Sequence, residues 1–220
     1  MFAILGGMKC FFLLLLSAAA VSVRAEQVVF APDFSHGLSN RWTNVSLYKS
    51  RTVYSVVSEG TNFFVHAAAD NSCSALTARL NLAPSAKKLK LRWRWRIAGV
   101  ATNGSDLILK KFDHAARVFV AFDTFIGPPR TLNYFWANQE PVGILLEHPL
   151  TGRAKDFIVE SGNEKAGRWV AEERDVTADW KRAFPGKAMP KIAAVGMLTD
   201  GDSLEIKISG DYADLQLIAE

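Results

Sequence analysis

Residues 91–97 read "LRWRWRI", a strict alternation of apolar and arginine side chains. Successive side chains of a β-strand point to opposite faces, so this spacing separates two sets of residues. The apolar set consists of Leu91, Trp93, Trp95 and Ile97. The cationic set consists of Arg92, Arg94 and Arg96. Because large aromatic side chains dominate core energetics, the stretch predicts a strand with buried tryptophans and outward-facing arginines.

Similar strand signals recur along most of the chain. Alternating or β-branched segments occur at residues 53–57, 63–69, 88–97, 116–122, 131–137, 156–160, 168–176, 192–198, 204–208 and 213–218. Turn-forming clusters such as "SEGTN", "ATNGSD" and "TDGDS" separate them. Many short strands at this spacing predict an all-β fold, an antiparallel sandwich of two sheets. One short helix is expected near 177–184, with Thr177 as its N-cap and Pro185-Gly186 as its stop.

The first 25 residues have the pattern of a signal peptide. Lys9 precedes an apolar run over 10–23, and Val23-Arg24-Ala25 places small residues at a cleavage site. The run is shorter than the roughly 18 residues that a membrane span needs. We therefore expect cleavage after residue 25, a single domain over 26–220 without a membrane span, and a periplasmic or secreted location.

Charge and cysteine content narrow the class of protein further. Loss of Lys9 and Arg24 leaves 24 basic residues against 22 acidic ones. Nucleic-acid binders usually have a strong basic excess, so no nucleic-acid partner is expected. Cys73 is the one cysteine left after cleavage, so the predicted domain forms no internal disulfide. We expect its thiol to be buried, with intermolecular pairing or reactivity as the alternatives.

The outward-facing arginines raise the question of a binding surface. If the strands at 91–97, 116–122, 131–137 and 168–176 are neighbours in one sheet, one polar surface with Glu172 carries Arg94, Arg96, Arg117, Asn133 and Arg174. We expect these five residues to bind a ligand, because arginine forks suit carboxylate, sulfate or phosphate groups. The alternative is a ladder of cross-strand ion pairs, for example with Asp123, that binds nothing.

No complete catalytic motif is present. A polysaccharide lyase needs a group that neutralises a uronate and a base, for which the candidates are Arg117, Asn133, Tyr134 and His114. A glycoside hydrolase needs two carboxylates at a defined separation, and the pairs to test are Asp113 with Asp123 and Glu172 with Glu173. Residues 201–204 spell "GDSL", the nucleophile signature of an esterase family, but no histidine follows to act as its base.

Several stretches are familiar when taken together. In order they are "LRWRWRI" (91–97), "FDHAARVFVAFD" (112–123), "RTLNYFWA" (130–137), "GRWVAEERDVTADW" (167–180) and "VGMLTDGD" (195–202). The set resembles the bacterial domain-of-unknown-function 3047 family over about 33–217. That resemblance implies an exported protein and assigns no activity. The pattern departs at 110–113 and directly after Asp202, so no site is carried over to Asp113 or Asp202.

Two end segments are similar to carbohydrate-binding jelly rolls. "FAPDFSHGLSNRW" (30–42) resembles their opening strand and turn, and "GDYADLQL" (210–217) resembles their closing strand. The similarity implies a jelly-roll-like sandwich and a structural calcium held by acids near both ends, which here are Asp33, Asp211 and Asp214. The alternative is that these acids form turns and face solvent. Metal binding by Asp200 and Asp202 is left open.

The leading hypothesis is an exported, non-catalytic module that binds an anionic or neutral glycan on its arginine-lined sheet face. The second is a polysaccharide lyase or glycoside hydrolase of the same architecture. The third is a structural envelope protein without a ligand. The sequence leaves the oligomeric state and the identity of the ligand open.

Overall fold

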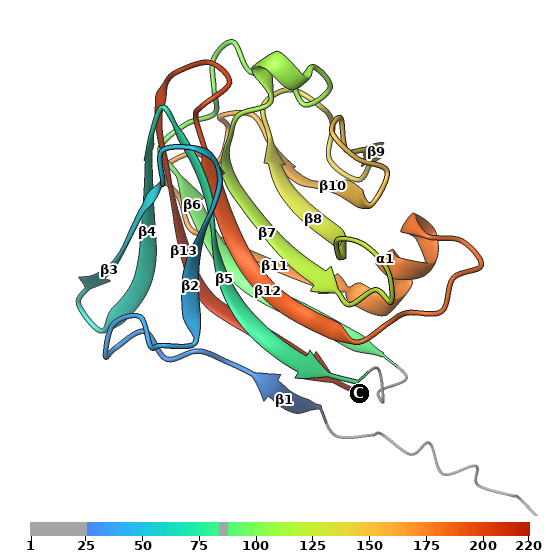
Figure 1. Ribbon diagram of the computed structural model, residues 1–220. Coiled ribbons are helices and arrows are strands. Elements are labelled where there is room, and N and C mark those ends of the chain that lie inside the picture. The colour runs from blue at the N-terminus through green and yellow to red at the C-terminus, as the bar shows by residue number, and fades with distance from the viewer. Residues whose placement is uncertain (1–25, 84–87) are drawn as a thin grey trace, which may run out of the picture.

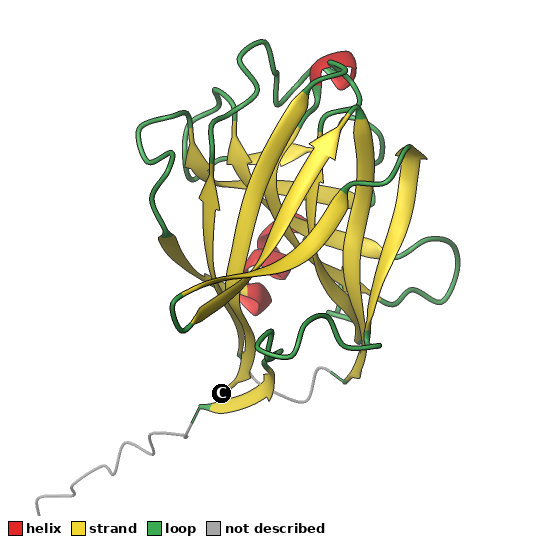
Figure 2. Cartoon of the chain, turned by 90° about the vertical axis from the view of Figure 1, so that its left-hand side faces the viewer, coloured by secondary structure: helices red, strands yellow, loops and turns green. Residues whose placement is uncertain are grey.

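The computed structural model describes residues 26–220 apart from 84–87, and in it two β-sheets pack face to face (Figure 1). The predicted signal peptide, residues 1–25, lies outside the described residues. Strands make up both layers, and helical turns are confined to short segments (Figure 2). The expected two-sheet sandwich with one short α-helix is therefore confirmed. No helix within the described ranges is long and apolar enough to cross a membrane.

The first sheet has six strands. Its neighbouring strands are, in order, β11 (Val170–Asp175), β6 (Leu89–Ile97), β13 (Lys207–Ala219), β4 (Asn62–Asp70) and β3 (Val53–Glu59). A short β1 (Gln27–Phe30) pairs with the far end of β13. All pairs in this sheet are antiparallel.

The second sheet has seven strands. Their order is β2 (Trp42–Lys49), β5 (Ser72–Leu82), β12 (Ile192–Asp200), β7 (His114–Phe122), β8 (Arg130–Ala137), β10 (Ala154–Ser161) and β9 (Leu145–Glu147). All pairs are antiparallel except β8 with β10, which run parallel. A parallel pair needs a crossover connection, and residues 138–153, with β9 inside them, supply it.

The two sheets enclose the core, and β6 contributes its apolar set to it. Trp93 and Trp95 are buried, and their ring centroids lie 5.3 Å apart in an edge-to-face arrangement. Trp93 also contacts Tyr134, and Trp95 contacts Trp136, at centroid distances of 5.5 and 5.6 Å across the sandwich. The predicted burial of both tryptophans of "LRWRWRI" is confirmed.

Helix α1 (Val176–Ala183) covers one end of the core. Its N-cap is Asp175, whose carboxylate accepts a hydrogen bond from the Ala178 N–H at 2.9 Å, and not the expected Thr177. The Thr177 hydroxyl instead accepts a hydrogen bond from the Leu89 N–H and ties the helix to β6. Trp180 is buried against Phe122, with ring centroids 4.5 Å apart.

Some strands carry too little of the usual signal to be predicted from the sequence. The longest of these, β5, reads "SCSALTARLNL" and is rich in alanine and serine instead of β-branched residues. It lies between β2 and β12 and buries one face in the core. The expected strand at 213–218 lies within one long strand, β13, but most of the expected strand at 204–208 is wrong, because residues 204–205 form a turn and β13 begins at Lys207. β13 contains a bulge where Asp214 has a positive φ of 52°.

Candidate functional site

Arg94 and Arg96 lie on the outer face of the six-stranded sheet, as predicted, and both are paired with acids. The Arg94 Nε donates a hydrogen bond to the Asp214 carboxylate at 2.5 Å. The Arg96 Nε donates to Asp211 at 2.8 Å, and its Nη2 donates to Glu59, also at 2.8 Å. These acids come from β13 and β3, so the contacts are cross-strand ion pairs on one sheet surface.

The flat faces of the same arginines are also covered. The indole of Trp169 lies 5.2 Å from the Arg94 guanidinium and 4.8 Å from that of Arg96, both measured to a ring centroid. Phe64 packs edge-on against Trp169 and lies under Arg96. Charged partners and aromatic faces thus occupy this surface in the way that the ion-pair alternative describes.

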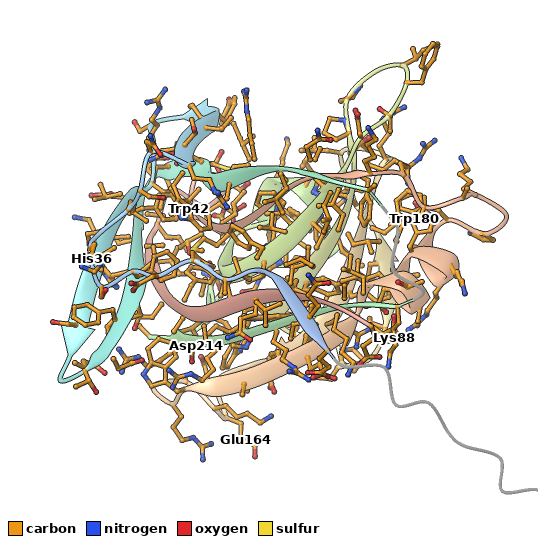
Figure 3. All side chains as sticks on the ribbon, turned by 90° about the horizontal axis from the view of Figure 1, so that it is seen from below. His36, Trp42, Lys88, Glu164, Trp180 and Asp214 are labelled. Carbon is orange, nitrogen blue, oxygen red and sulfur yellow. The ribbon has the colours of Figure 1, made fainter. Side chains whose placement is uncertain are left out.

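The three acids expected to share a calcium ion do not converge. Asp211 contacts His66 at 2.7 Å as well as Arg96, while Asp214 contacts Arg94. Asp33 is exposed and accepts hydrogen bonds from the backbone and hydroxyl of Ser35. His36, beside Asp33, and Asp214 lie well apart in Figure 3. The expectation of one calcium site formed by these acids is corrected, because each already has its own partner.

Arg174 faces the interior of the sandwich and not the outer arginine surface. In the β11–β6 pairing it lies opposite Leu91, a core residue, so the two side chains share the inner face. Its guanidinium makes two hydrogen bonds to the Asp179 carboxylate, at 2.6 and 2.9 Å, and lies over the Tyr134 ring. The predicted grouping of Arg174 with Arg94 and Arg96 is therefore wrong.

Arg117 and Asn133 lie in the other sheet, which corrects the expectation of a single five-residue surface. They occupy the outer face of the seven-stranded sheet, on the neighbouring strands β7 and β8. Arg117 pairs with Phe135, and Asn133 lies two residues before Phe135 on β8, so the side chains of Arg117 and Asn133 are diagonal neighbours. Both are buried. The structure thus keeps this pair together and separates it from the other three arginines.

The Arg117 guanidinium has an incomplete set of partners. It lies 4.2 Å from the Phe135 ring centroid and 5.4 Å from that of Phe112, and its Nη2 reaches the Asp200 carboxylate at 3.5 Å. Its Nε is buried and has no hydrogen-bond partner among the described residues. Burial raises the pKa of Asp200 to about 7, although Arg117 acts in the opposite direction. This arginine is a buried cation with a free donor.

Asp156 on β10 supplies the complementary acceptor. It lies opposite Asn133 in the parallel β8–β10 pairing, and its Oδ1 accepts a hydrogen bond from the Asn133 amide at 2.7 Å. Its Oδ2 is buried without a partner among the described residues. Burial raises the pKa of Asp156 to about 6, while the charge of Arg117 acts to lower it. An acid between apolar Ala154 and Ile158 on one strand face was the sequence signal that could have revealed it.

His148 belongs to the same surroundings. Its ring lies 5.1 Å from the Phe112 ring centroid, and its Nδ1 accepts a hydrogen bond from the Leu150 N–H. Burial lowers its pKa to about 3, and the charge of Arg117 acts in the same direction, so the ring is neutral at pH 7. We call Arg117, Asn133, His148, Asp156 and Asp200 the Arg117 cluster.

The part of the chain that the structure describes also gathers Cys73, Asp200 and Asp202, whose ligand atoms lie within 4.8 Å of one another. Cys73 is buried, as expected, and burial raises the pKa of its thiol well above the usual range. A protonated thiol is a poor metal ligand, and the Arg117 cation beside Asp200 repels a metal ion. This trio therefore does not establish a metal centre.

The residues named for catalysis are not assembled into a site. The hydroxyl of Tyr134 is sealed in the core, and His114 is buried with its Nε2 2.9 Å from the Asp106 carboxylate. Asp113 accepts hydrogen bonds from the backbone of the 203–204 turn, and it precedes β7 whereas Asp123 follows it. The nine-residue strand β7 spans roughly 30 Å and separates these two acids, whereas the two catalytic carboxyl groups of a glycosidase lie roughly 5 to 10 Å apart.

The pair Glu172 and Glu173 is divided as the strand alternation predicts. Glu172 faces inward and accepts a hydrogen bond from the Trp95 Nε1 at 3.3 Å, and burial raises its pKa to about 7. Glu173 faces outward and pairs with Arg92. The serine of "GDSL", Ser203, donates its hydroxyl to the Leu109 carbonyl, and among the described residues that hydroxyl has no hydrogen bond to a histidine or a carboxylate. None of these arrangements supports the enzyme alternatives.

Solved structures with a similar fold include several modules that bind carbohydrate. One is a family 11 carbohydrate-binding module from the cellulase Lic26A-Cel5E of Clostridium thermocellum, with 12% identity and a TM-score of 0.50 over 90% of this chain and 97% of that chain. Another is the CBM22-1 xylan-binding domain of Xyn10C from Paenibacillus barcinonensis, with 9% identity and a TM-score of 0.47 over 90% and 99%. At such identities the likeness shows the jelly-roll fold alone.

A comparison with curated protein sequences finds no match. A family model, by contrast, matches residues 40–216, a stretch that contains most of both sheets and the whole Arg117 cluster. Its description is "protein of unknown function (DUF3047)". The expected resemblance is confirmed, and this chain belongs to the DUF3047 family.

Proposed function

We propose that this protein is an exported, non-catalytic glycan-binding module whose ligand is held at the Arg117 cluster. The observation that carries the proposal is a buried donor and a buried acceptor, Arg117 Nε and Asp156 Oδ2, which lie on one sheet face and have no partner within the described part of the chain. Buried polar groups normally have partners, so two such atoms on one face favour a ligand that completes them. A fold shared with a family 11 carbohydrate-binding module supports a sugar as that ligand.

The charges of the cluster favour a neutral sugar over an anionic one. A single guanidinium stands among two carboxyl groups, those of Asp156 and Asp200, and His148 is neutral. Sugar hydroxyls both donate and accept hydrogen bonds, so they fit a site that offers an arginine, an amide and a carboxylate together. A uronate or sulfate would meet like charge from the acids, which costs binding energy.

Access to the cluster depends on the 138–153 crossover. Ile144 and Leu146 pack against the apolar cluster that contains Phe135, and His148 packs on Phe112, so this segment covers the same sheet face. Its strand, β9, has three residues and lies at the sheet edge, which makes it the least extensively paired strand there. We infer that the ligand enters when this segment shifts outward.

A glycan array with the mature protein, followed by calorimetric titration, tests the proposal. We expect Asp156→Asn to weaken binding of the selected glycan about tenfold or more, because an acceptor becomes a donor while the Asn133 contact survives. Stability should stay equal or rise, since the variant no longer ionises a buried carboxyl whose pKa is raised to about 6. The matched control is Asp214→Asn on the opposite sheet, which should bind like the parent.

Each other outcome points to a definite alternative. Equal affinity of the Asp156→Asn variant and the parent would place the ligand elsewhere. If the array selected uronate-containing or sulfated polymers, Arg94 and Arg96 on the outer face of the six-stranded sheet would become the candidate binding residues. An array without any bound glycan would favour the structural envelope protein.

Export is tested separately. Cleavage after Ala25 would leave Glu26 at the mature N-terminus, where its carboxylate contacts Lys90 and Arg92 of β6. We expect N-terminal sequencing of the protein recovered from the periplasm or medium to begin at Glu26. An uncleaved chain retained in the membrane fraction would contradict export as a free domain.

A further inference from the structure

The loop between β7 and β8, residues 123–129, presents two large apolar side chains to solvent. Phe125 is fully exposed at 103% of its reference area, and the adjacent Ile126 is 78% exposed. Leu150, on the loop before β10, is a third exposed apolar residue at the same end of the sheet. Isolated exposed apolar residues are common, but a loop that presents two at its tip marks a contact surface.

This loop is held in shape by its neighbours. The Arg153 side chain donates hydrogen bonds to the carbonyls of Ile126 and Pro128, at 3.1 and 2.8 Å. The Thr124 hydroxyl lies within hydrogen-bond distance of the Gly127 and Pro128 carbonyls. Three consecutive carbonyls at the tip therefore have partners inside the protein, and the two prolines lack an N–H. When such a tip moves from water into an apolar environment, few of its backbone polar groups lose hydrogen bonds to water.

The loop that follows α1 is joined to the tip loop and carries exposed cations. Lys181 on α1 and Lys187 and Lys191 on the following loop are exposed, and the described residues give them no ion-pair partner. The Lys191 carbonyl accepts a hydrogen bond from the Asp123 N–H at 2.8 Å, which joins that loop to the 123–129 loop. In Figure 3 the yellow-green 123–129 loop projects toward the upper right, and the loop after α1 projects to the right, near Trp180. Asp123 is the exposed acid within the tip loop.

We infer that this end of the sandwich docks on an anionic lipid surface, with Phe125 and Ile126 entering the boundary between headgroups and acyl chains. An apolar tip flanked by unpaired lysines is the combination that binds peripheral proteins to such surfaces. A sugar fits the tip less well, because Ile126 has no flat face for stacking and the tip carbonyls are already occupied. The inference does not depend on the glycan proposal, since it concerns other residues.

Co-sedimentation of the mature protein with vesicles tests the inference. We expect binding to phosphatidylcholine vesicles that contain phosphatidylglycerol, and at least tenfold weaker binding to vesicles of phosphatidylcholine alone. The double variant Phe125→Ser with Ile126→Ser should lose about tenfold or more in affinity for the anionic vesicles. Its matched control is Leu47→Ser, which removes an exposed apolar side chain from β2.

The electrostatic part has its own variants. The double variant Lys187→Glu with Lys191→Glu should also lower the affinity for anionic vesicles about tenfold or more. A higher salt concentration should lower the affinity of the parent protein for the same vesicles, because salt screens the lysine charges. The control is Lys110→Glu with Lys111→Glu, the same charge change on the exposed η1 turn (Leu109–Lys111). In a Phe125→Trp variant, brominated lipid should quench the fluorescence of the new tryptophan, because its ring enters the boundary between headgroups and acyl chains.

The inference would be overturned if the parent protein did not bind anionic vesicles. It would also be overturned if the Phe125→Ser, Ile126→Ser variant bound them with the affinity of the parent. A tip variant that loses affinity for a soluble glycan and keeps its vesicle binding would overturn it as well, because the tip would then be a sugar platform. Thermal denaturation of each variant checks that the fold survives. We expect it to survive, because the four side chains replaced in the two test variants are exposed, namely Phe125, Ile126, Lys187 and Lys191.

Discussion

Replacing Trp95 with alanine should lower the free energy of unfolding by about 3 to 5 kcal/mol. Its indole is fully buried and lies between Trp93 of its own strand and Trp136 of the facing sheet. Truncation removes both ring contacts and leaves a cavity that neighbouring aromatic rings cannot fill without moving. It also leaves the half-buried Glu172 without its donor, the Trp95 Nε1.

Urea denaturation of the two proteins measures this loss directly. Trp169→Ala is the matched control, because that indole lies on the outer face over Arg94 and Arg96 and is partly exposed. Trp169→Ala should lose clearly less free energy of unfolding than Trp95→Ala. If Trp95→Ala fails to fold, Trp95→Phe should still give a measurable loss. An unchanged midpoint for both core variants would mean that the tryptophans do not hold the sheets together.

Replacing Arg117 with methionine should cost about 3 kcal/mol at pH 8, because it removes the cation from a buried pair. Methionine keeps the volume between Phe112 and Phe135, so packing is largely retained. What remains is the Asp200 carboxylate, buried and without its counter-charge. The double variant with Asp200→Asn should recover part of the loss, since it also removes that charge.

The pH dependence separates charge from packing in this variant. The pKa of Asp200 is raised from 3.8 to about 7 in the folded protein, so its contribution to stability is present at low pH. That contribution is lost as the pH rises between those values, because the unfolded state releases the proton first. Without Arg117 the folded-state pKa rises further, and the deficit should be larger at pH 8 than at pH 5. An equal deficit at both values would assign Arg117 to packing alone.

Some of the candidate site was predictable. Strand alternation predicts that Arg117 and Asn133 face outward, because each lies opposite the apolar side chains of its own strand, and the structure places them as diagonal neighbours. Asp156 and His148 were missed. Asp156 lies on a parallel strand that reaches β8 through the 138–153 crossover, and nothing in the local pattern indicates that pairing. His148 follows β9, whose three residues give too short a signal to recognise.

Alternation along each strand is sufficient to predict which side of that strand faces the core. In "LRWRWRI" the alternation of Trp93 and Trp95 with the arginines is a local property of extended backbone, so it held without knowledge of the partners. The same reasoning separated Glu172 from Glu173. The number of turn-separated strands was enough to indicate a sandwich, because short amphipathic strands must bury one face against another sheet.

Which strands are neighbours, by contrast, depends on how the whole chain folds. Residues 98–113 carry the chain from β6 in one sheet to β7 in the other, and this crossing separates Arg94 and Arg96 from Arg117. Arg174 faces inward because β11 pairs with β6 in a register that sets it opposite Leu91. Strand order and register depend on contacts between residues far apart in the chain, and alternation within one strand carries no information about them.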